Sequence, residues 1–487
     1  MEESPYASPR PRGPVDDSFP ARGIASPAPS LGMWDAASII VGIVVGTAIF
    51  KSPTLVFQNA AGPWHALGVW LLGGALCLNG AVCYAELATA YPRNGGDYEY
   101  LGRALGRWLG FLFGWAQLTV VLTASIAAMA YAFADYAAVL VAEAGSAPPP
   151  LLTAGLAIAA VTAVTLVNLA GMVAGKLVQN VLTGAKVLGL AAVVVAGFAW
   201  GDPGHLGPGA PTRPLEGPGF GLALVFVLYA FGGWNDAVFV TAEVRDVRKN
   251  LPRALIVSIT GVTALYLAVN AAFLLALGFD GARQTYAPAA DTVAVALGDF
   301  GRRAVSALVM VSALGAINGM TLAGARLYAT VGEDHRVFGW LARRKAQAPP
   351  VAALLAQGII AVLMIGAVGT PTGTAALDAV LTAVWLRPLP WEEYFGGFET
   401  LVAATAPVFW LFFLLTGVSI FVLRAVDANR ERPFPIPFYP APPIVFCLMC
   451  GYMLYSSVAY AKALSLIGVV PLVVGLPLYL LSRERRE

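Results

Sequence analysis

Long apolar runs recur along almost the whole of this 487-residue chain, and they constrain its fold more than any other feature. Many of the runs reach about twenty residues, the length of helix that crosses the roughly 30 Å hydrocarbon core of a bilayer. Only 12% of the residues are charged, against about 25% in an average soluble domain. These observations predict an integral membrane protein.

Twelve candidate spans follow one another along the sequence. Their apolar character is continuous and does not alternate, which favours helices over the strands of a membrane barrel. A helix also pairs its own backbone amides, as a lipid environment requires. The predicted class is an all-α membrane protein with 12 transmembrane helices near residues 34–57, 65–90, 108–141, 151–170, 177–200, 219–243, 254–279, 303–330, 350–369, 398–424, 441–460 and 464–481.

The termini and the loop charges predict the orientation. Residues 1–30 are rich in Pro and Ser and lack an apolar run, which is typical of a disordered tail and not of a signal peptide. With the N-terminus inside, 22 of the 30 Lys and Arg residues fall on the inner side. Because positive charge concentrates in cytoplasmic loops, we expect a multi-pass protein of the cell (plasma) membrane. Both termini, including the tail 483–487, should be cytoplasmic.

Composition and motifs disfavour several function classes. The net charge of +2 is spread over many loops, so nucleic acid is not an expected partner. The His-Glu-x-x-His and Gly-x-Ser-x-Gly patterns of many hydrolases do not occur. The three histidines lie in loops or at span ends, lack metal-ligand spacing and are expected to be solvated: His65, His205 and His335. We predict no enzyme, no metal site and no cofactor.

The cysteines limit the covalent partners. All four fall within predicted spans, at Cys77, Cys83, Cys447 and Cys450. The spacing of the last two could suit a metal or redox pair, but without further ligands nearby the simpler interpretation is small packing residues. Since no cysteine falls in a predicted outer loop, no disulfide-linked partner subunit is expected.

Two spans are interrupted at corresponding positions. Span 1 has a small-residue break from Gly46 to Ala48, and span 6 has the pair Gly232 and Gly233 near its middle. Broken helices persist in lipid only where protein or a water-filled cavity satisfies the freed backbone groups. Because spans 1 and 6 begin two successive sets of five, the pattern indicates an inverted-repeat transporter with its binding site at the breaks. Close helix packing at small residues is the alternative.

The ends of such broken helices suit an amino acid. A half-helix that starts at a break presents unpaired N–H groups and a positive dipole end, which favour a carboxylate. The carbonyl ends of the other half-helices favour an ammonium group or a cation. A zwitterion would therefore need no buried side-chain charge.

Several motifs resemble the amino acid-polyamine-organocation superfamily, and especially its L-type amino acid transporter branch. The resemblance covers residues from about 34 to 460. It is carried by Gly46-Thr47-Ala48-Ile49-Phe50, Tyr84-Ala85-Glu86-Leu87, Pro92 to Tyr100, Phe231-Gly232-Gly233-Trp234-Asn235, Asn250-Leu251-Pro252-Arg253-Ala254, Asn318 to Tyr328 and Arg432-Pro433-Phe434.

The resemblance implies the leucine-transporter fold. Residues 31–200 would form the first inverted repeat and residues 219–424 the second, with peripheral spans 11 and 12 in residues 440–482. It also implies a substrate site built largely from backbone around the two breaks, with an aromatic gate at Tyr229. Backbone around Thr47, Ala48 and Ile49 would receive the carboxylate, and carbonyls near Phe231 and Gly232 the amino group. The full set of implied substrate-binding residues is Ile43, Gly46, Thr47, Ala48, Ile49, Tyr229, Ala230, Phe231, Gly232 and Gly233.

One residue departs from the family pattern. Ala48 stands where the family has a second glycine. Because alanine avoids positive φ, we expect the backbone at the carboxylate site to differ from that of other members.

Lys186 is the most informative single side chain. It lies about ten residues into its span, roughly 15 Å along the helix, which is too deep for its side chain to reach the interface easily. A lysine at this depth costs about 2.5 to 3.5 kcal/mol unless it faces the protein interior, and burial disfavours its charged form. The resemblance implies an amine held where sodium-driven relatives bind an ion. We interpret Lys186 as a cation surrogate or proton site, with a structural role as the alternative.

The remaining polar candidates are weaker. Asn235, Asp236 and Asn318 are possible pocket residues. Asp236 could contact a cationic side chain, but it could equally cap a half-helix or face solvent. Between spans 9 and 10, residues 375–387 could form a short amphipathic helix on the outer face, with its tryptophan at headgroup depth.

The sequence therefore predicts a secondary active amino acid transporter. Neutral L-amino acids are favoured because a cationic substrate would need a buried carboxylate, and Asp236 is the only obvious local candidate. The resemblance implies sodium-independent transport with alternating access, by exchange or by proton symport. The expected partners are an amino acid substrate, the lipid bilayer and, for symport, protons. A proton-coupled permease for cationic amino acids or polyamines, and a non-translocating amino acid sensor, remain alternatives.

Overall fold

A computed structural model gives the arrangement of most of the chain. It describes residues 32–91, 95–141, 149–169, 175–207, 212, 219–235, 244–342, 350–383, 385, 387–389, 391 and 396–482. The predictions for the tails 1–30 and 483–487 therefore lie outside the described residues.

The described part of the chain is helical, and none of it forms a β-strand. Each of the twelve predicted ranges contains helix. The elements are α1 (Met33–Val44), η1 (Thr47–Phe50), α2 (Ser52–Gln58), α3 (Pro63–Ala90), α4 (Asp97–Leu105), α5 (Arg107–Ala116), η2 (Gln117–Val121), α6 (Leu122–Val141), α7 (Pro150–Leu169), α8 (Gly175–Trp200), η3 (Pro203–Leu206), α9 (Gly219–Ala230), α10 (Val247–Ala282), α11 (Pro288–Asp334), η5 (Arg336–Phe338), α12 (Val351–Gly369), α13 (Pro371–Ala383), α14 (Gly396–Val426), α15 (Ala441–Ala461), η7 (Lys462–Ser465) and α16 (Leu466–Leu481).

Eight helices of the described part are long and apolar enough to cross a membrane, when α5 with α6, and α15 with α16, are each counted as one continuous helix. Two shorter apolar helices, Leu188–Trp200 and Gly219–Ala230, accompany them. The all-helical class is thereby confirmed for the described residues, with eight candidate membrane spans. The number of twelve crossings stays a prediction.

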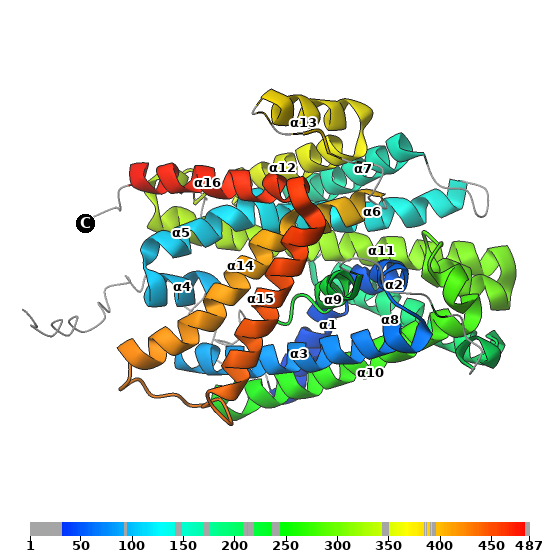
Figure 1. Ribbon diagram of the computed structural model, residues 1–487, viewed down its shortest axis with the longest axis horizontal. Coiled ribbons are helices and arrows are strands. Elements are labelled where there is room, and N and C mark those ends of the chain that lie inside the picture. The colour runs from blue at the N-terminus through cyan, green and yellow to red at the C-terminus, as the bar shows by residue number, and fades with distance from the viewer. Residues whose placement is uncertain are drawn as a thin grey trace, which may run out of the picture.

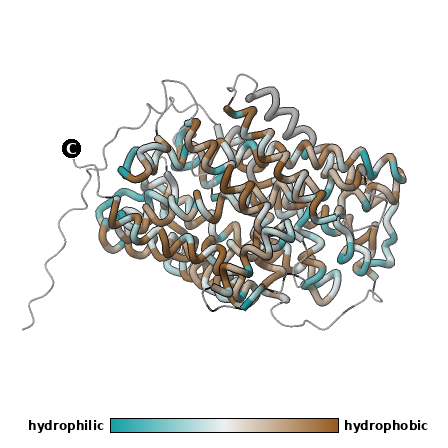
Figure 2. The backbone as a smooth tube through the Cα atoms, turned by 90° about the horizontal axis from the view of Figure 1, so that it is seen from above, coloured by the Kyte–Doolittle hydropathy of each residue, from teal (hydrophilic) through white to brown (hydrophobic). Residues whose placement is uncertain are grey.

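The long helices enclose the short ones. In Figure 1, α3, α10, α11 and α12 run roughly along the long axis of the molecule, and α14 and α15 cross it obliquely. The short helices α1, α2 and α9 lie near the middle of the same view. In Figure 2, hydrophobic segments dominate the helices and hydrophilic ones gather mostly toward the two ends of the long axis, as expected for a bundle that crosses a bilayer.

Two of the longest helices are bent at glycines. Gly278 in α10 has φ 66° and Gly298 in α11 has φ 58°. These left-handed conformations favour glycine because it has no Cβ. A short segment of α10 therefore follows its bend and a short segment of α11 precedes its bend. The connection between the two helices contacts α2.

Candidate functional site

The first predicted break is present in the structure. Helix α1 ends at Val44, and the chain then passes through Gly46 in an extended conformation, with φ −91° and ψ −174°. A 3-10 turn starts at Thr47, and α2 continues from Ser52. The apolar run of span 1 is therefore two half-helices joined by a short unwound segment.

The restart at Thr47 leaves backbone donors available. The first N–H groups of a helix have no partner within the helix, and no hydrogen bond from the N–H of Thr47 or Ala48 to another element is found among the described residues. Thr47, Ala48 and Ile49 are at most 6% exposed. The hydroxyl of Thr47 lies 3.4 Å from that of Ser312 in α11. The site expected to receive a carboxylate is thus buried and rich in N–H donors.

Ala48 fits this backbone without strain. It is not among the described residues with positive φ, because it lies within the 3-10 turn, whose φ angles are negative. The expected difference from the backbone of other family members stays a prediction.

The second break has a different shape. Helix α9 ends at Ala230, and residues 231–235 form successive turns. The N–H of Gly232 donates to Tyr229 O at 2.9 Å, and a Cβ on Gly232 would lie 2.9 Å from that same oxygen. Gly233 has φ 98°, a conformation that L side chains rarely adopt. Both glycines are therefore required by the local backbone.

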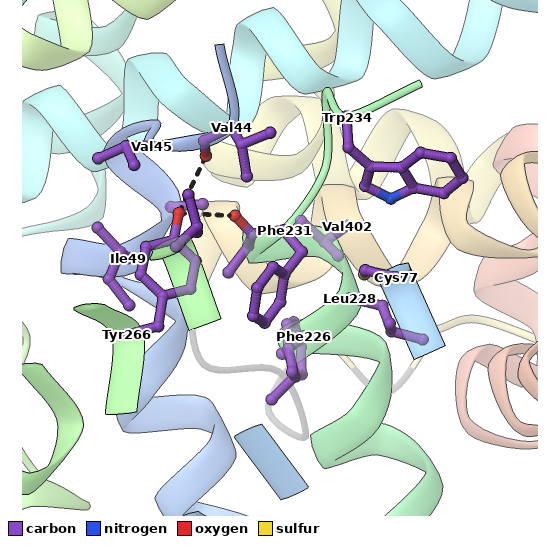
Figure 3. Close-up of a cluster of buried hydrophobic side chains, with 14 of the residues drawn as sticks. Val44, Val45, Ile49, Cys77, Phe226, Leu228, Phe231, Trp234, Tyr266 and Val402 are labelled. Carbon is purple, nitrogen blue, oxygen red and sulfur yellow. Dashed lines mark hydrogen bonds between the residues drawn. The ribbon is translucent and has the colours of Figure 1, made fainter. Parts of the chain in front are cut away.

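A tyrosine of α10 joins the two breaks. The hydroxyl of Tyr266 lies 2.9 Å from Val44 O and 3.1 Å from Ala230 O, the last carbonyls of α1 and α9. Figure 3 shows Tyr266 between the unwound segments, close to Phe231, and their ring centroids are 5.0 Å apart. The carbonyl ends of two half-helices, which carry partial negative charge, are thereby gathered at one point.

Sequence analysis missed Tyr266. One available signal was a tyrosine hydroxyl in the middle of the apolar run of α10, because polar side chains inside a membrane usually have a partner or a function. The identity of its partners was not accessible, since they lie 222 and 36 residues away in the sequence.

The aromatic residues beside the second break pack tightly. Tyr229 is half-buried, and its ring meets that of Phe398 of α14 edge-on, with centroids 5.7 Å apart. Trp234 is 4% exposed and meets Tyr84 of α3 edge-on at 5.0 Å. The gating role of Tyr229 stays a prediction, and Trp234 is an additional aromatic neighbour of the break.

Lys186 lies in the interior of α8. It is 6% exposed, and no hydrogen bond or ion pair to it is found within the described part of the chain. One turn further along α8, Gly189 has its Cβ position 3.5 Å from the ring of Phe50 in the first break. A buried amine thus lies one helical turn from a contact with the candidate substrate site.

The other candidates are less closely associated with the breaks. Asn318 of α11 accepts a hydrogen bond of 2.8 Å from Asn168 of α7, which joins the two helices. Asn235 ends the second break and is half-buried. Ile43 lies in α1, one residue before its end, and Asp236 lies outside the described residues.

The second half of span 1, Lys51 with α2, is held by polar contacts that sequence analysis did not identify. Lys51 is 3% exposed and pairs with Asp135 of α6 at 2.6 Å. Its Nζ also donates to Tyr286 O at 3.2 Å. The hydroxyl of Thr54 and the amide of Gln58 donate to Thr285 O and Arg283 O, at 3.2 and 2.8 Å. Helix α2 is therefore fastened to the connection between α10 and α11.

The opposite end of the bundle has its own buried polar contacts. Asp97 accepts hydrogen bonds from the hydroxyls of Tyr84 and Thr416, at 2.6 and 3.0 Å. Burial raises the pKa of Asp97 to about 6. Glu86 of α3 accepts from Arg424 Nε of α14 at 2.8 Å and from the N–H of Ile436 at 2.7 Å. These contacts tie α3 and α4 to α14.

One minor expectation is wrong. His335 is 3% exposed and not solvated, because it packs edge-on against Phe111 with ring centroids 4.9 Å apart. Its Nε2 lies 3.3 Å from the hydroxyl of Tyr98. No group of His, Cys, Asp and Glu within the described ranges has the arrangement of a metal site.

Comparison of the sequence with known proteins identifies its family. The family model described as amino acid permease matches residues 31–475. The b(0,+)-type amino acid transporter 1 of Homo sapiens is 29% identical over 438 residues, which cover 88% of this chain and 82% of that protein. The Asc-type amino acid transporter 1 of Mus musculus is 28% identical over 460 residues, or 93% of this chain and 81% of that protein.

A third relative is the large neutral amino acids transporter small subunit 2 of Homo sapiens, which is 29% identical over 493 residues, or 97% of this chain and 84% of that protein. The resemblance seen in the sequence motifs is confirmed. The chain belongs to the amino acid permease family, whose members are membrane transporters and not enzymes.

Proposed function

We propose that this protein is a sodium-independent secondary active transporter of neutral L-amino acids, which works with alternating access by exchange or by proton symport. The observation that carries the proposal is the meeting of two broken helices at Tyr266, with buried N–H donors at Thr47 and Ala48 beside them.

The backbone of the two breaks would bind the common part of the substrate. The N–H groups of Thr47, Ala48 and Ile49, with Gly46 beside them, would receive the carboxylate, because a helix start favours an anion. The carbonyls near Phe231 and Gly232 would receive the ammonium group. Tyr266 holds two carbonyl ends together before the substrate arrives, and such preorganisation lowers the cost of binding.

The contacts between helices support a leucine-transporter fold with twelve crossings. In a five-plus-five inverted repeat, each span has a counterpart five places away in the order of spans. A contact between two spans should then recur between their two counterparts. The contact of α1 with α10 corresponds to that of α9 with α3. In the same way, the contact of α6 with α7 corresponds to that of α11 with α12, and the contact of α8 with α11 to that of α14 with α6. The self-equivalent pairs α3 with α10, α6 with α11 and α7 with α12 also contact. Residues 31–200 and 219–424 would be the repeats, and 440–482 the peripheral spans.

Lys186 would supply the cation. A buried amine without an acidic partner in the described residues is stable in its neutral form or beside a negative group. Lys186 lies one turn from the contact of Gly189 with Phe50. This position supports a role in which the charged amine holds the first break in place, and in which loss of its proton lets the break move.

Neutral substrates fit the described surroundings best. The described residues of the two breaks, 44–50 and 230–235, include no carboxylate side chain, so a cationic side chain would have no buried partner there. One relative is named for large neutral amino acids. We further propose a plasma-membrane location with both termini cytoplasmic, and no disulfide-linked partner, since Cys77, Cys83, Cys447 and Cys450 lie in α3 and α15.

A ligand screen tests the substrate class. A ligand that binds only the folded protein stabilises it by about 2.7 kcal/mol at one hundred times its Kd. The melting temperature of the purified protein should therefore rise with neutral L-amino acids and stay unchanged with lysine, arginine or polyamines. A rise with cationic compounds alone would replace the proposal with a cationic permease.

Transport in proteoliposomes tests the mechanism. Uptake should be the same in sodium and in choline buffers. Acidifying the outside of empty vesicles should drive accumulation by a proton symporter, whereas an exchanger should take up labelled substrate only into preloaded vesicles. Lys186→Met should abolish the coupled uptake, and Lys462→Met, at the end of α15, is the matched control that keeps it. Binding without flux in both vesicle types would identify a sensor.

A further inference from the structure

Helix α13 (Pro371–Ala383) carries its single charge on the side that faces the protein. The half-buried residues form one stripe at helical spacing, and Asp378 belongs to it: Gly373, Thr374, Leu377, Asp378 and Leu381. The exposed face has no charged side chain and includes Ala375, Ala376, Ala379, Val380, Thr382 and Ala383. A helix on a protein surface in water has the opposite arrangement, with charges outward and apolar groups inward.

The carboxylate of Asp378 is satisfied within the protein. One oxygen accepts from the N–H of Leu389 and the other from the indole N–H of Trp391, each at 3.0 Å. The two donors lie on the chain that returns from α13 toward α14. Asp378 therefore needs no water on the exposed side and fixes the helix against the returning segment.

Helix α13 lies beside the bundle and not above its end. The Cβ position of Gly373 is 2.0 Å from Gly366 O, so this residue packs directly on the last turn of α12. Leu381 and Trp391 pack against a cluster that includes Ala403 and Ala404, which lie about two turns into α14. Figure 1 shows α13 at the edge of the molecule, running alongside α12.

The exposed face of α13 continues the lipid-facing surface of its neighbour. In the membrane-crossing α12, Ile359 is 58% and Leu363 is 64% exposed. On α13, Val380 is 63% exposed, and Trp385 just beyond it is 97% exposed. Tryptophan is enriched where the hydrocarbon core meets the headgroups, and an apolar helix of this length suits an interfacial or re-entrant segment.

We propose that α13 is a re-entrant helix whose exposed face contacts lipid acyl chains, with Trp385 among the headgroups. The membrane is thus the partner of this face. The topology proposed above would place α13 in the outer leaflet, but the contact with lipid does not depend on that topology.

Spin labelling tests the contact. Single cysteines replace Val380 and, as a second position on the same face, Ala376, in a Cys447→Ala background that removes the half-buried native thiol. The labelled proteins are reconstituted into phosphatidylcholine vesicles. Collision rates are measured with oxygen, which concentrates in lipid, and with a nickel chelate, which stays in water. Leu363→Cys is the lipid-facing reference, and Asp280→Cys in the outer part of α10 is the water-facing one.

We expect the labels at positions 380 and 376 to match the lipid-facing reference, with oxygen collisions several-fold above nickel collisions. Nickel-dominated collisions, as at position 280, would place α13 in water and overturn the proposal. Low collision rates with both reagents would mean that another protein surface, such as a second copy of the chain, covers this face, and would overturn it as well. Because collision rates do not depend on transport, substrate uptake by the same labelled proteins reports separately on the proposed function.

Discussion

The two helix breaks share a purpose in the fold but use different backbone devices. The first resumes as helix at Thr47 and leaves N–H donors, with Gly46 in an ordinary extended conformation. The second continues as turns after Ala230 and depends on Gly233, whose φ is 98°. The comparison teaches that a glycine in a broken membrane helix can have two different reasons to be there. It can lie in an ordinary conformation with room around it, as Gly46 does, or it can adopt a positive φ that other residues avoid, as Gly233 does. Only the second kind is dictated by the backbone.

The strongest way to test this difference is Gly233→Ala. An L residue at this φ costs about 1 to 3 kcal/mol, so we expect a clear fall in melting temperature and at least a tenfold loss of substrate uptake. Gly42→Ala in α1 is the control, because nothing lies within 4 Å of its added Cβ and alanine favours a helix interior by about 0.5 to 1 kcal/mol. Equal effects of the two substitutions would contradict the assignment.

Removing the hydroxyl of Tyr266 tests what connects the breaks. Tyr266→Phe should lower the free energy of unfolding by about 1 kcal/mol, the net worth of a typical hydrogen bond. It should also reduce the rise in melting temperature caused by substrate, because two carbonyls are no longer held at one point. Tyr328→Phe is the matched control, since this buried hydroxyl donates to Gln117 O at 3.0 Å in a contact that involves neither break; it should cost similar stability with the substrate effect intact. An unchanged substrate effect in Tyr266→Phe would separate Tyr266 from binding.

The stability contributed by a buried carboxyl near the second break should depend on pH. Tyr84 packs against Trp234 of that break and donates to Asp97, whose pKa burial raises from 3.8 to about 6. The protonated carboxyl therefore contributes stability in full below about pH 4, and this is lost as the pH rises through about 6. Asp97→Asn keeps an acceptor for both hydroxyls, so its melting temperature should fall less than that of the unsubstituted protein between about pH 4 and about pH 7. Parallel curves would refute this role.

The smallest effect is expected for Gly46→Ala. The added Cβ would lie 3.8 Å from its nearest neighbour, Val44 O, and φ at this position is −91°. Stability should therefore stay within about 0.5 kcal/mol, the usual range for substitutions that disturb no specific feature. Thermal unfolding in detergent measures it. A loss comparable to that of Gly233→Ala would mean that the first break is also conformationally fixed.

The helices and both breaks could be predicted from the sequence because their signals are local. An apolar run, a glycine pair or a small-residue stretch is read without knowing what lies opposite. The pairing of Tyr266 with Val44, or of Lys51 with Asp135, depends on residues far away in the chain. Ala48 shows a further limit, because its φ angle is set by the 3-10 turn that contains it and not by its residue type.

The fastening of α2 has a consequence for how fast α2 can separate from the connection between α10 and α11. Lys51, Thr54 and Gln58 recur about once per helical turn and grip three neighbouring carbonyls, those of Tyr286, Thr285 and Arg283. A displacement large enough to break one of these hydrogen bonds also strains the next one. A partial separation therefore loses hydrogen bonds while α2 moves only a little. These contacts should therefore break together, and we expect the separation of α2 from this connection, where the transport cycle requires it, to be an all-or-none step.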